Sequence, residues 1–171
     1  MDATNDPNDR LGPEPGWESL ENLTTSHAGR SFVRRDGSGD RFALRYFRRP
    51  SDGALVGRIS FGIGCQGPPG HAHGGSMAAL LDDAMGVAAW IAGNMVVAAE
   101  ITIKFRNMLP LDTVIHLEAW VAEVDGKKVK TRGRICSVDG SAVYSEGSGL
   151  FIHLGPERFR EMIDRAKGGA L

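Results

Sequence analysis

The sequence predicts an α+β domain in which an antiparallel sheet wraps around one long buried helix. Residues 77–91 are apolar on nearly every side and contain no helix breaker, and a helix without a polar stripe has to be buried. Strand-like runs precede and follow this segment. A helix that is apolar all round can be covered only if a sheet curves around it.

The strand-like runs can be followed in order. Residues 40–49 are strand-like, and residues 54–64 carry apolar side chains on one parity, which indicates a strand with one buried face: Leu55, Ile59, Phe61 and Ile63. After the helix, four further runs are separated by turn residues, two of them at Asp-Gly pairs (125–126 and 139–140). The order of elements, two strands, a buried helix and four strands, is that of a hotdog fold.

The two ends of the chain differ from this core. Residues 1–16 are acidic and rich in proline and glycine, which predicts a disordered leader without the apolar region of a signal peptide. Residues 17–171 are expected to form a single domain with its core at 40–154. A short helix is expected at 17–28, and a short amphipathic helix at 156–167.

Composition excludes several classes of function. The 171 residues are 42% hydrophobic and 24% charged, with a formal net charge of −1, so no basic excess points to nucleic acid or to an anionic membrane. The longest apolar run, 77–93, is interrupted by two aspartates and is shorter than the ~20 residues of a bilayer span. Two distant cysteines suggest neither disulfides nor a zinc site. A cytoplasmic protein is expected.

Three short patterns resemble known motifs but lack their context. Gly62-x-Gly64-x-x-Gly67 matches a dinucleotide fingerprint, but two prolines follow where a helix should begin. His71 and His73 are spaced like metal ligands but have no third ligand nearby, and the alternative is that they bind loop backbone; no metal is expected. The His-Gly-Gly-Ser run resembles a lipase oxyanion loop, yet no Gly-x-Ser-x-Gly elbow is present.

The start of the apolar helix is a candidate anion site. A helix N-terminus presents unpaired amide groups and a partial positive charge. Gly74 and Gly75 leave this end free of side chains, so a substrate carbonyl oxygen can approach and be held as it becomes an oxyanion. A tight turn would explain the two glycines equally well.

A turn does not explain Asp82. A carboxylate in an apolar helix should be partnered, face water, or have a raised pKa suited to general-base or nucleophilic chemistry. Asp82 follows Gly74 by eight residues, about 12 Å along the axis, which is too far for both to act on one carbonyl. Two antiparallel helices related by a two-fold axis would bring these groups together from different copies. Asp83 points about 100° away from Asp82, and helix geometry alone does not choose between them.

Three stretches carry a family resemblance: GPPGHAHGGSMAALLDDAMG (67–86), KFRNMLPL (104–111) and YSEGSGLFIHL (144–154). Over roughly residues 54–154 the chain resembles the hotdog-fold acyl-CoA thioesterases of the PaaI type, especially the branch that includes the human thioesterase-superfamily members. The resemblance implies a dimer, or a dimer of dimers, with active sites between subunits.

The resemblance also implies roles for single residues. Gly74 matches the glycine whose amide polarises the thioester carbonyl, His73 shapes that turn, and Asp82, rather than Asp83, matches the catalytic acid. Basic residues that match positions contacting the coenzyme A nucleotide are Lys104, Arg106, Lys127 and Lys128, although a solvated strand face and hairpin tip would explain them nearly as well.

Two positions depart from the family pattern. Many relatives carry Thr or Ser on the strand after the helix to hold the attacking water, and gapless alignment places Ala98 there. Gln66 lies one residue away from a loop asparagine that some relatives aim at the site. Slower catalysis, or a water held by other groups such as Thr102, is one expected consequence.

The resemblance and the helix geometry together predict an acyl-CoA thioesterase that acts at a site shared between two subunits, with Gly75 beside the carbonyl-binding amide. Coenzyme A is then part of the substrate, and no separate cofactor is expected. The alternative is a non-catalytic hotdog protein that binds acyl-CoA or acyl carrier protein, which Ala98 favours. A hotdog dehydratase or hydratase is a third candidate, against which the place of His73 in the glycine turn argues.

Overall fold

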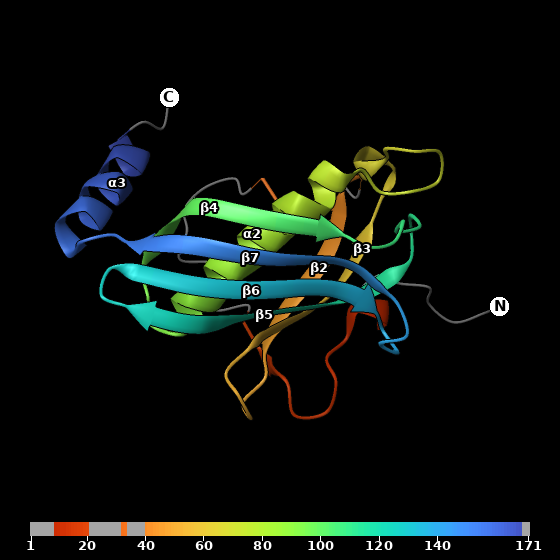
Figure 1. Cartoon of the computed structure of the whole chain (residues 1–171), viewed down its shortest axis with the longest axis horizontal. Helices are drawn as coiled ribbons and strands as arrows, with labels where there is room; N and C mark the ends of the chain where they lie inside the picture. The colour runs from red at the N-terminus through yellow and green to blue at the C-terminus, as the bar shows by residue number, and fades with distance from the viewer. Residues whose placement is uncertain (1–8, 21–31, 34–39, 169–171) are drawn as a thin grey trace.

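The computed structural model describes residues 9–20, 32–33 and 40–168. Its strands form one antiparallel seven-stranded sheet in the order β1-β2-β3-β5-β6-β7-β4 (Figure 1). The strands are β1 Glu18–Ser19, β2 Phe42–Arg48, β3 Leu55–Phe61, β4 Val96–Phe105, β5 Val114–Asp125, β6 Lys128–Ser137 and β7 Val143–His153. The helical elements are the 3₁₀ turns η1 Asp9–Leu11 and η2 Ile63–Cys65 and the helices α2 Gly74–Ile91 and α3 Pro156–Gly168.

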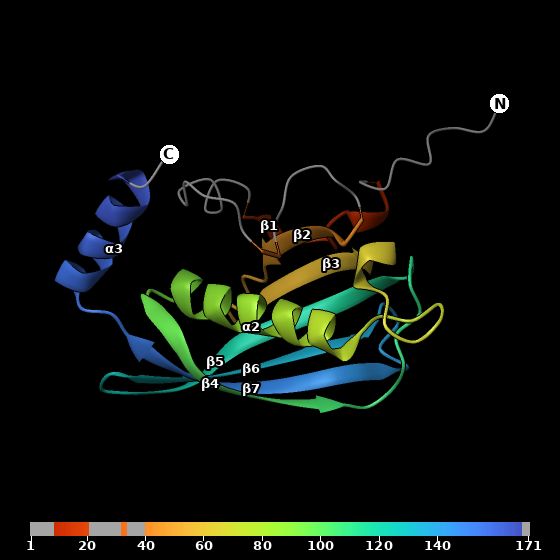
Figure 2. The same ribbon diagram turned by 90° about the horizontal axis from the view of Figure 1, so that it is seen from above.

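Helix α2 lies along one face of the curved sheet, as Figure 2 shows from above. Seven of its side chains are buried: Met77, Leu80, Leu81, Ala84, Met85, Ala88 and Ala89. They pack on inward-facing residues of β3, β5, β6 and β7, among them Ile59, Ile115, Leu117, Ile135 and Phe151. The predicted hotdog fold, a sheet around one long apolar helix, is therefore confirmed.

Glycines in the sheet let the helix approach closely. Gly133 and Gly147 are cross-strand partners beneath α2. A Cβ added at Gly133 would lie 3.1 Å from Cδ2 of Leu81, and one at Gly147 would lie 3.4 Å from Cε of Met85. Contacts this close leave little room for a side chain at either position. The helix therefore lies close to the sheet because glycines in the sheet leave room for its Leu81 and Met85 side chains.

The N-terminal segment packs on the outer face of the sheet, which the sequence does not predict. Leu11 in η1 is 2% exposed, although residues 9–16 belong to the expected disordered leader. Glu14 forms an ion pair with the buried Arg58 of β3, whose guanidinium carbon lies 5.1 Å from the ring centroid of Trp17. This cover explains why β3 is buried on both faces rather than on one.

Other differences concern element ends. The helix expected at 17–28 is wrong at its start, where β1 pairs with β2, and residues 21–28 lie outside the described residues. Ile63 does not continue the buried face of β3, because the strand ends at Phe61 and Ile63 is exposed in η2. Among the described helices, none is long and apolar enough to cross a membrane.

Strand β4 forms one edge of the sheet, next to β7 (Figure 1). It is exposed along most of its length and carries large apolar side chains at the surface: Val97 (42% exposed), Ile101 (38%) and Phe105 (53%). Unpaired backbone groups and exposed apolar side chains on an edge strand form a template for pairing with another strand. Natural proteins seldom leave such an edge uncovered.

Candidate active site

The helix begins at Gly74, three residues before the predicted start, because His73 caps it. Nδ1 of His73 accepts a hydrogen bond from the Gly75 amide at 2.8 Å. The His73 carbonyl oxygen accepts from the amides of Ser76 (3.0 Å) and Met77 (3.3 Å). Among the described residues, no acceptor contacts the remaining first-turn amide, that of Gly74. This N–H is therefore available to a ligand, at the positive end of the helix dipole.

Close approach of neighbours, rather than a tight turn, requires the two glycines. Neither has a positive φ. A Cβ at Gly75 would lie 2.8 Å from Nδ1 of His73, so a side chain there would displace the capping imidazole. A Cβ at Gly74 would lie 3.2 Å from Cζ of Phe105, whose ring packs on the first turn of α2 from β4. The glycines thus keep His73 and Phe105 against the free amide.

The preceding loop is held by backbone contacts. The His73 amide donates to the Cys65 carbonyl at 2.7 Å, and the Ala72 amide donates to the Leu109 carbonyl at 2.8 Å. Nδ1 of His71 lies 2.9 Å from the Pro69 carbonyl oxygen, so it is the protonated ring nitrogen that donates there. Both histidines therefore bind backbone, which is the alternative to metal binding. Within the described part of the chain, no cluster of three metal-ligating side chains occurs.

Gln66 and Gly67 contribute to this loop rather than to a nucleotide site. Oε1 of Gln66 accepts from the Gly70 amide at 3.1 Å, which closes the loop on itself. A Cβ at Gly67 would lie 2.8 Å from Cα of His73, so a glycine is needed where the loop crosses the helix start. The glycine fingerprint therefore has a local packing explanation. The predicted role of Gln66 in substrate binding stays a prediction.

The two aspartates of α2 have different surroundings. Oδ1 of Asp82 is buried and accepts no hydrogen bond from any described residue. Burial, and then the negative charge of Asp83, raise the pKa of Asp82 above its ordinary value. Asp83 instead accepts a hydrogen bond on Oδ2 from the hydroxyl of Tyr46 in β2, at 2.9 Å. Of the two aspartates, Asp82 is the one with a buried oxygen that no described residue binds, and its role as the catalytic acid stays a prediction.

Asp82 and Asp83 also point toward different strands of the sheet. Tyr46 draws Asp83 toward β2. Asp82 shares its face of the helix with Gly86, one turn later, where a Cβ would lie 3.5 Å from the ring of Phe151 in β7. Asp82 therefore lies on the side of β7 and β4, the same side as the Gly74 amide and Phe105. Along the helix axis the amide and the carboxylate remain about 12 Å apart, because eight residues separate them.

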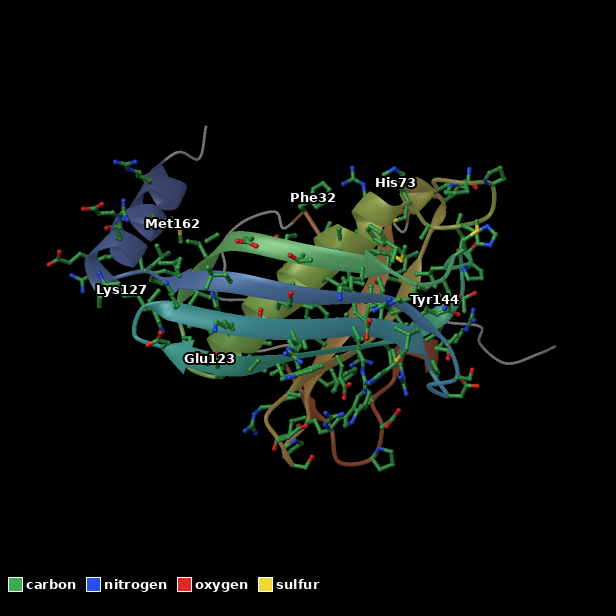
Figure 3. All side chains as sticks on the ribbon, viewed as in Figure 1. Phe32, His73, Glu123, Lys127, Tyr144 and Met162 are labelled. Atoms are coloured by element: carbon green, nitrogen blue, oxygen red, sulfur yellow. The ribbon has the colours of Figure 1, made fainter. Side chains whose placement is uncertain are left out.

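A single chain does not gather the four predicted basic residues. Lys104 is exposed in β4 near the helix start, and Nε of Arg106 donates to Glu146 at 2.8 Å. Lys127 and Lys128 lie at the β5–β6 turn, at the other end of the sheet from His73 (Figure 3). The His153 amide donates to the Lys127 carbonyl, so this turn adjoins the first residues of β4. The two basic pairs are therefore near opposite ends of β4.

Ala98 lies in β4 at an irregularity of the strand. It pairs with Phe151 of β7, and the register shifts between Ala98 and Glu100. Its methyl group offers neither donor nor acceptor to a water molecule. Thr102, the suggested substitute, follows on the same strand and pairs with Ser148.

Two site residues are absent from the sequence-based set. Phe105 could have been found, since its alternation with Lys104 and Arg106 places it on the inward face of β4. Tyr46 could not, because the sequence does not give the register that brings β2 beside the middle of α2.

Comparison with known proteins agrees with this fold. Residues 69–144, which hold α2, β4, β5, β6 and the first two residues of β7, match the family model of the thioesterase superfamily. The acyl-coenzyme A thioesterase THEM4 of Xenopus laevis is 33% identical over 128 residues, which are 74% of this chain and 58% of that protein. The chain spans about half the length of the curated relatives it matches, 49% to 58%.

Solved structures share the same architecture. A crystal structure of a thioesterase-superfamily protein aligns with a TM-score of 0.61 at 34% identity, over 64% of this chain and 53% of that one. A hypothetical thioesterase from Streptococcus pneumoniae TIGR4, solved with coenzyme A, aligns with a TM-score of 0.60 at 18% identity, over 69% and 90% of the two chains. The chain is a hotdog-fold protein. Its match to the thioesterase superfamily extends over residues 69–144.

The unpaired carboxylate predicts a stability effect. Asp82→Asn removes a charge that burial and Asp83 disfavour, so we expect the folded state to gain on the order of 1 kcal/mol at neutral pH. Because the pKa of Asp82 is raised on folding, its contribution to stability is present below the ordinary carboxyl pKa and lost as pH rises through the raised value. The gain should therefore shrink in acid. Urea unfolding of both proteins at acidic and neutral pH measures this, and a variant less stable at neutral pH would contradict it.

Proposed function

We propose that this protein is an acyl-CoA thioesterase whose active site is completed by a second copy of the chain. The observation that carries the proposal is the separation of two reactive groups along α2. The Gly74 amide is free to hold a carbonyl oxygen, and Asp82 has a buried carboxylate oxygen without a partner, yet about 12 Å separates them. Each group is incomplete alone, and a two-fold partner supplies the other.

Strand β4 supports the mode of association. Antiparallel pairing of β4 with the β4 of a second copy would cover the exposed edge and continue the sheet across both copies. The two α2 helices then run antiparallel, so the first turn of one approaches the middle of the other. Gly74 and Asp82 both lie on the β4 side of the helix, which is the side that faces the partner in this arrangement.

In such a site, the thioester carbonyl oxygen accepts a hydrogen bond from the Gly74 amide and gains negative charge in the tetrahedral state. Asp82 of the partner subunit takes a proton from water, and the water oxygen forms a bond to the carbonyl carbon. The carbon–sulfur bond then breaks, and the same carboxyl group gives its proton to the departing thiolate, so coenzyme A thiol and free acid are released. Direct attack by the same carboxylate would give an acyl anhydride that water then hydrolyses. Both routes need an ionised Asp82.

The proposed pairing also gathers the basic residues. Lys127 and Lys128 adjoin the start of β4, and Lys104 and Arg106 lie at its end. Antiparallel strands place the start of one beside the end of the other, so the two pairs would meet from different copies. Four cations at the entrance of one shared site suit the phosphates of coenzyme A. Arg106 would then bind a phosphate either in place of Glu146 or together with it.

The relatives support this reading. The curated relatives are named acyl-coenzyme A thioesterases. The pneumococcal thioesterase was also crystallised as two alanine mutants, one at an aspartate and one at a threonine sixteen positions later. The same spacing leads here from Asp82 to Ala98. The cytoplasmic location and a dimer of dimers stay predictions from the sequence.

Ala98 favours one other function, a hotdog protein that binds acyl-CoA or acyl carrier protein without hydrolysing the thioester. A hydroxyl at this position would hold and orient water, and alanine does not. Binding through the Gly74 amide and the basic residues would be unaffected. The two functions differ only in turnover.

Loss of the acid should abolish turnover. We expect Asp82→Ala to lower kcat for a panel of acyl-CoA thioesters by at least about a hundredfold, because general acid–base catalysis alone contributes that much. Thiol release detected with a chromogenic disulfide measures kcat, and light scattering checks that the variant remains a dimer. Turnover near the wild-type value in a well-folded Asp82→Ala dimer would reject the assignment.

Restoring the hydroxyl should raise turnover. We expect Ala98→Thr to increase kcat several-fold with little change in KM, because the added group acts on water rather than on substrate. Ala99→Thr, at the neighbouring position of the strand irregularity, is the matched control and should leave kcat unchanged. If wild type binds acyl-CoA tightly, shows no turnover, and gains none in Ala98→Thr, the binding function is correct instead.

A further inference from the structure

We propose that Asp83, held by the hydroxyl of Tyr46, is a positioning residue that makes the neighbouring carboxylate of Asp82 a stronger base through its negative charge. The inference rests on the proposed function for its catalytic consequence. Neither helix formation nor the proposed hydrolysis requires an aspartate at position 83, and the inference gives that residue a role. Asp83 touches no substrate in this proposal and acts only through Asp82.

The geometry of three groups carries the inference. Asp82 and Asp83 are consecutive residues in α2, and they are the only charged residues of that helix. Tyr46 is 5% exposed, and its hydroxyl donates to Oδ2 of Asp83 at 2.9 Å. A hydrogen bond donated to a carboxylate favours the ionised form. Tyr46 therefore favours a negative charge one residue from the unpartnered oxygen of Asp82.

The elements packed against α2 supply few other charges. Pairing registers place only uncharged residues on the inward parity of β3, β5 and β6, such as Ile59, Leu117 and Gly133. Inward-facing β4 residues are likewise uncharged. Titratable or charged groups on the inward parity of the remaining strands are Tyr46 and Arg48 of β2, Glu18 of β1 and His153 of β7. Glu18 forms an ion pair with Arg48, and Arg48 and His153 lie toward the C-terminal end of the helix.

A low-dielectric helix face strengthens the repulsion between neighbouring carboxylates. Burial raises the pKa of Asp82 first, and the charge of Asp83 raises it further. A carboxylate with a raised pKa binds a proton more tightly, so its ionised form is a better proton acceptor than an ordinary aspartate. The adjacent carboxylates therefore lower the stability of the folded helix and raise the basicity of Asp82.

The decisive variant is Asp83→Asn, which keeps the shape and the acceptor for Tyr46 while removing the charge. The acid limb of the kcat/KM against pH profile reports ionisation of the free enzyme's base. Without the charge of Asp83 the pKa of Asp82 falls, so we expect this limb to move to lower pH. Asp83→Glu, which restores the charge, should return it toward the wild-type position, and Tyr46→Phe should move it in the same direction as Asp83→Asn.

Glu123→Gln is the matched control. It also removes one carboxylate, but Glu123 is exposed on β5, away from α2, and binds Lys130 at 2.8 Å. Its acid limb should coincide with that of wild type. An unchanged limb in Asp83→Asn, or an equal shift in Glu123→Gln, would overturn the inference. If Asp83→Asn merely loosened the fold, kcat/KM would fall at all pH values without a shift of the limb, which would also overturn it.

A measurement without turnover separates this inference from the proposed function. Carbon-13 NMR of protein labelled at aspartate carboxyl carbons titrates Asp82 directly, with Asp82→Asn to assign its signal. We expect the midpoint of Asp82 to be lower in Asp83→Asn than in wild type even if the protein hydrolyses no thioester tested. An unchanged midpoint would refute the inference while leaving Asp82 as the catalytic acid untouched.

Discussion

A rigid helix fixes how this protein can work. Helix α2 carries both the amide of Gly74 and the Oδ1 atom of Asp82, neither of which has a hydrogen-bond partner among the described residues, and eight residues of helix hold them about 12 Å apart. The sheet keeps the helix straight and close, because Gly133 and Gly147 remove side chains where Leu81 and Met85 press against it. No rotation of a side chain brings the two groups onto one carbonyl. One copy therefore lacks part of the proposed active site, and pairing through the exposed edge strand β4 is the proposed way to complete it.

The same helix shows where stability has been given up for reactivity. Most of α2 is packed apolar surface, yet it holds two adjacent carboxylates, and the Oδ1 atom of Asp82 is buried without a described partner. A buried polar atom without a hydrogen bond opposes folding. At the helix start most backbone amides are satisfied, because His73 accepts from the Gly75 amide. Of the first-turn amides, only that of Gly74 has no acceptor among the described residues. Strain of this kind is typical of functional sites, whose requirements conflict with those of folding.

Sequence reasoning reached the fold and named most residues of the candidate site, and its limits have physical causes. Apolar periodicity gave the buried helix and six strands, because burial of a helix and of one strand face leaves a direct trace in the order of side chains. It missed the cover formed by Leu11 and Trp17, since a short segment that lies on a sheet has no period of its own. It left Asp82 and Asp83 equivalent until the family resemblance was considered. Only the register of β2, which brings Tyr46 to Asp83, distinguishes their surroundings, and register depends on contacts distant in sequence.

Subunit complementation tests the central claim most directly. Gly74→Pro removes the amide hydrogen at the first helical position, where proline is tolerated, and the extended ψ of 139° at His73 suits a following proline. The ring of Phe105, which would lie 3.2 Å from the added Cβ, has to shift by a few tenths of an ångström to make room. Gly74→Pro and Asp82→Ala chains should each be inactive alone. After co-refolding in equal amounts, half of the dimers are mixed and each mixed dimer has one intact site, so activity should return to about a quarter of the wild-type value. If the mixture stays as inactive as its components while mass spectrometry shows mixed dimers, the amide and the acid do not meet across two copies.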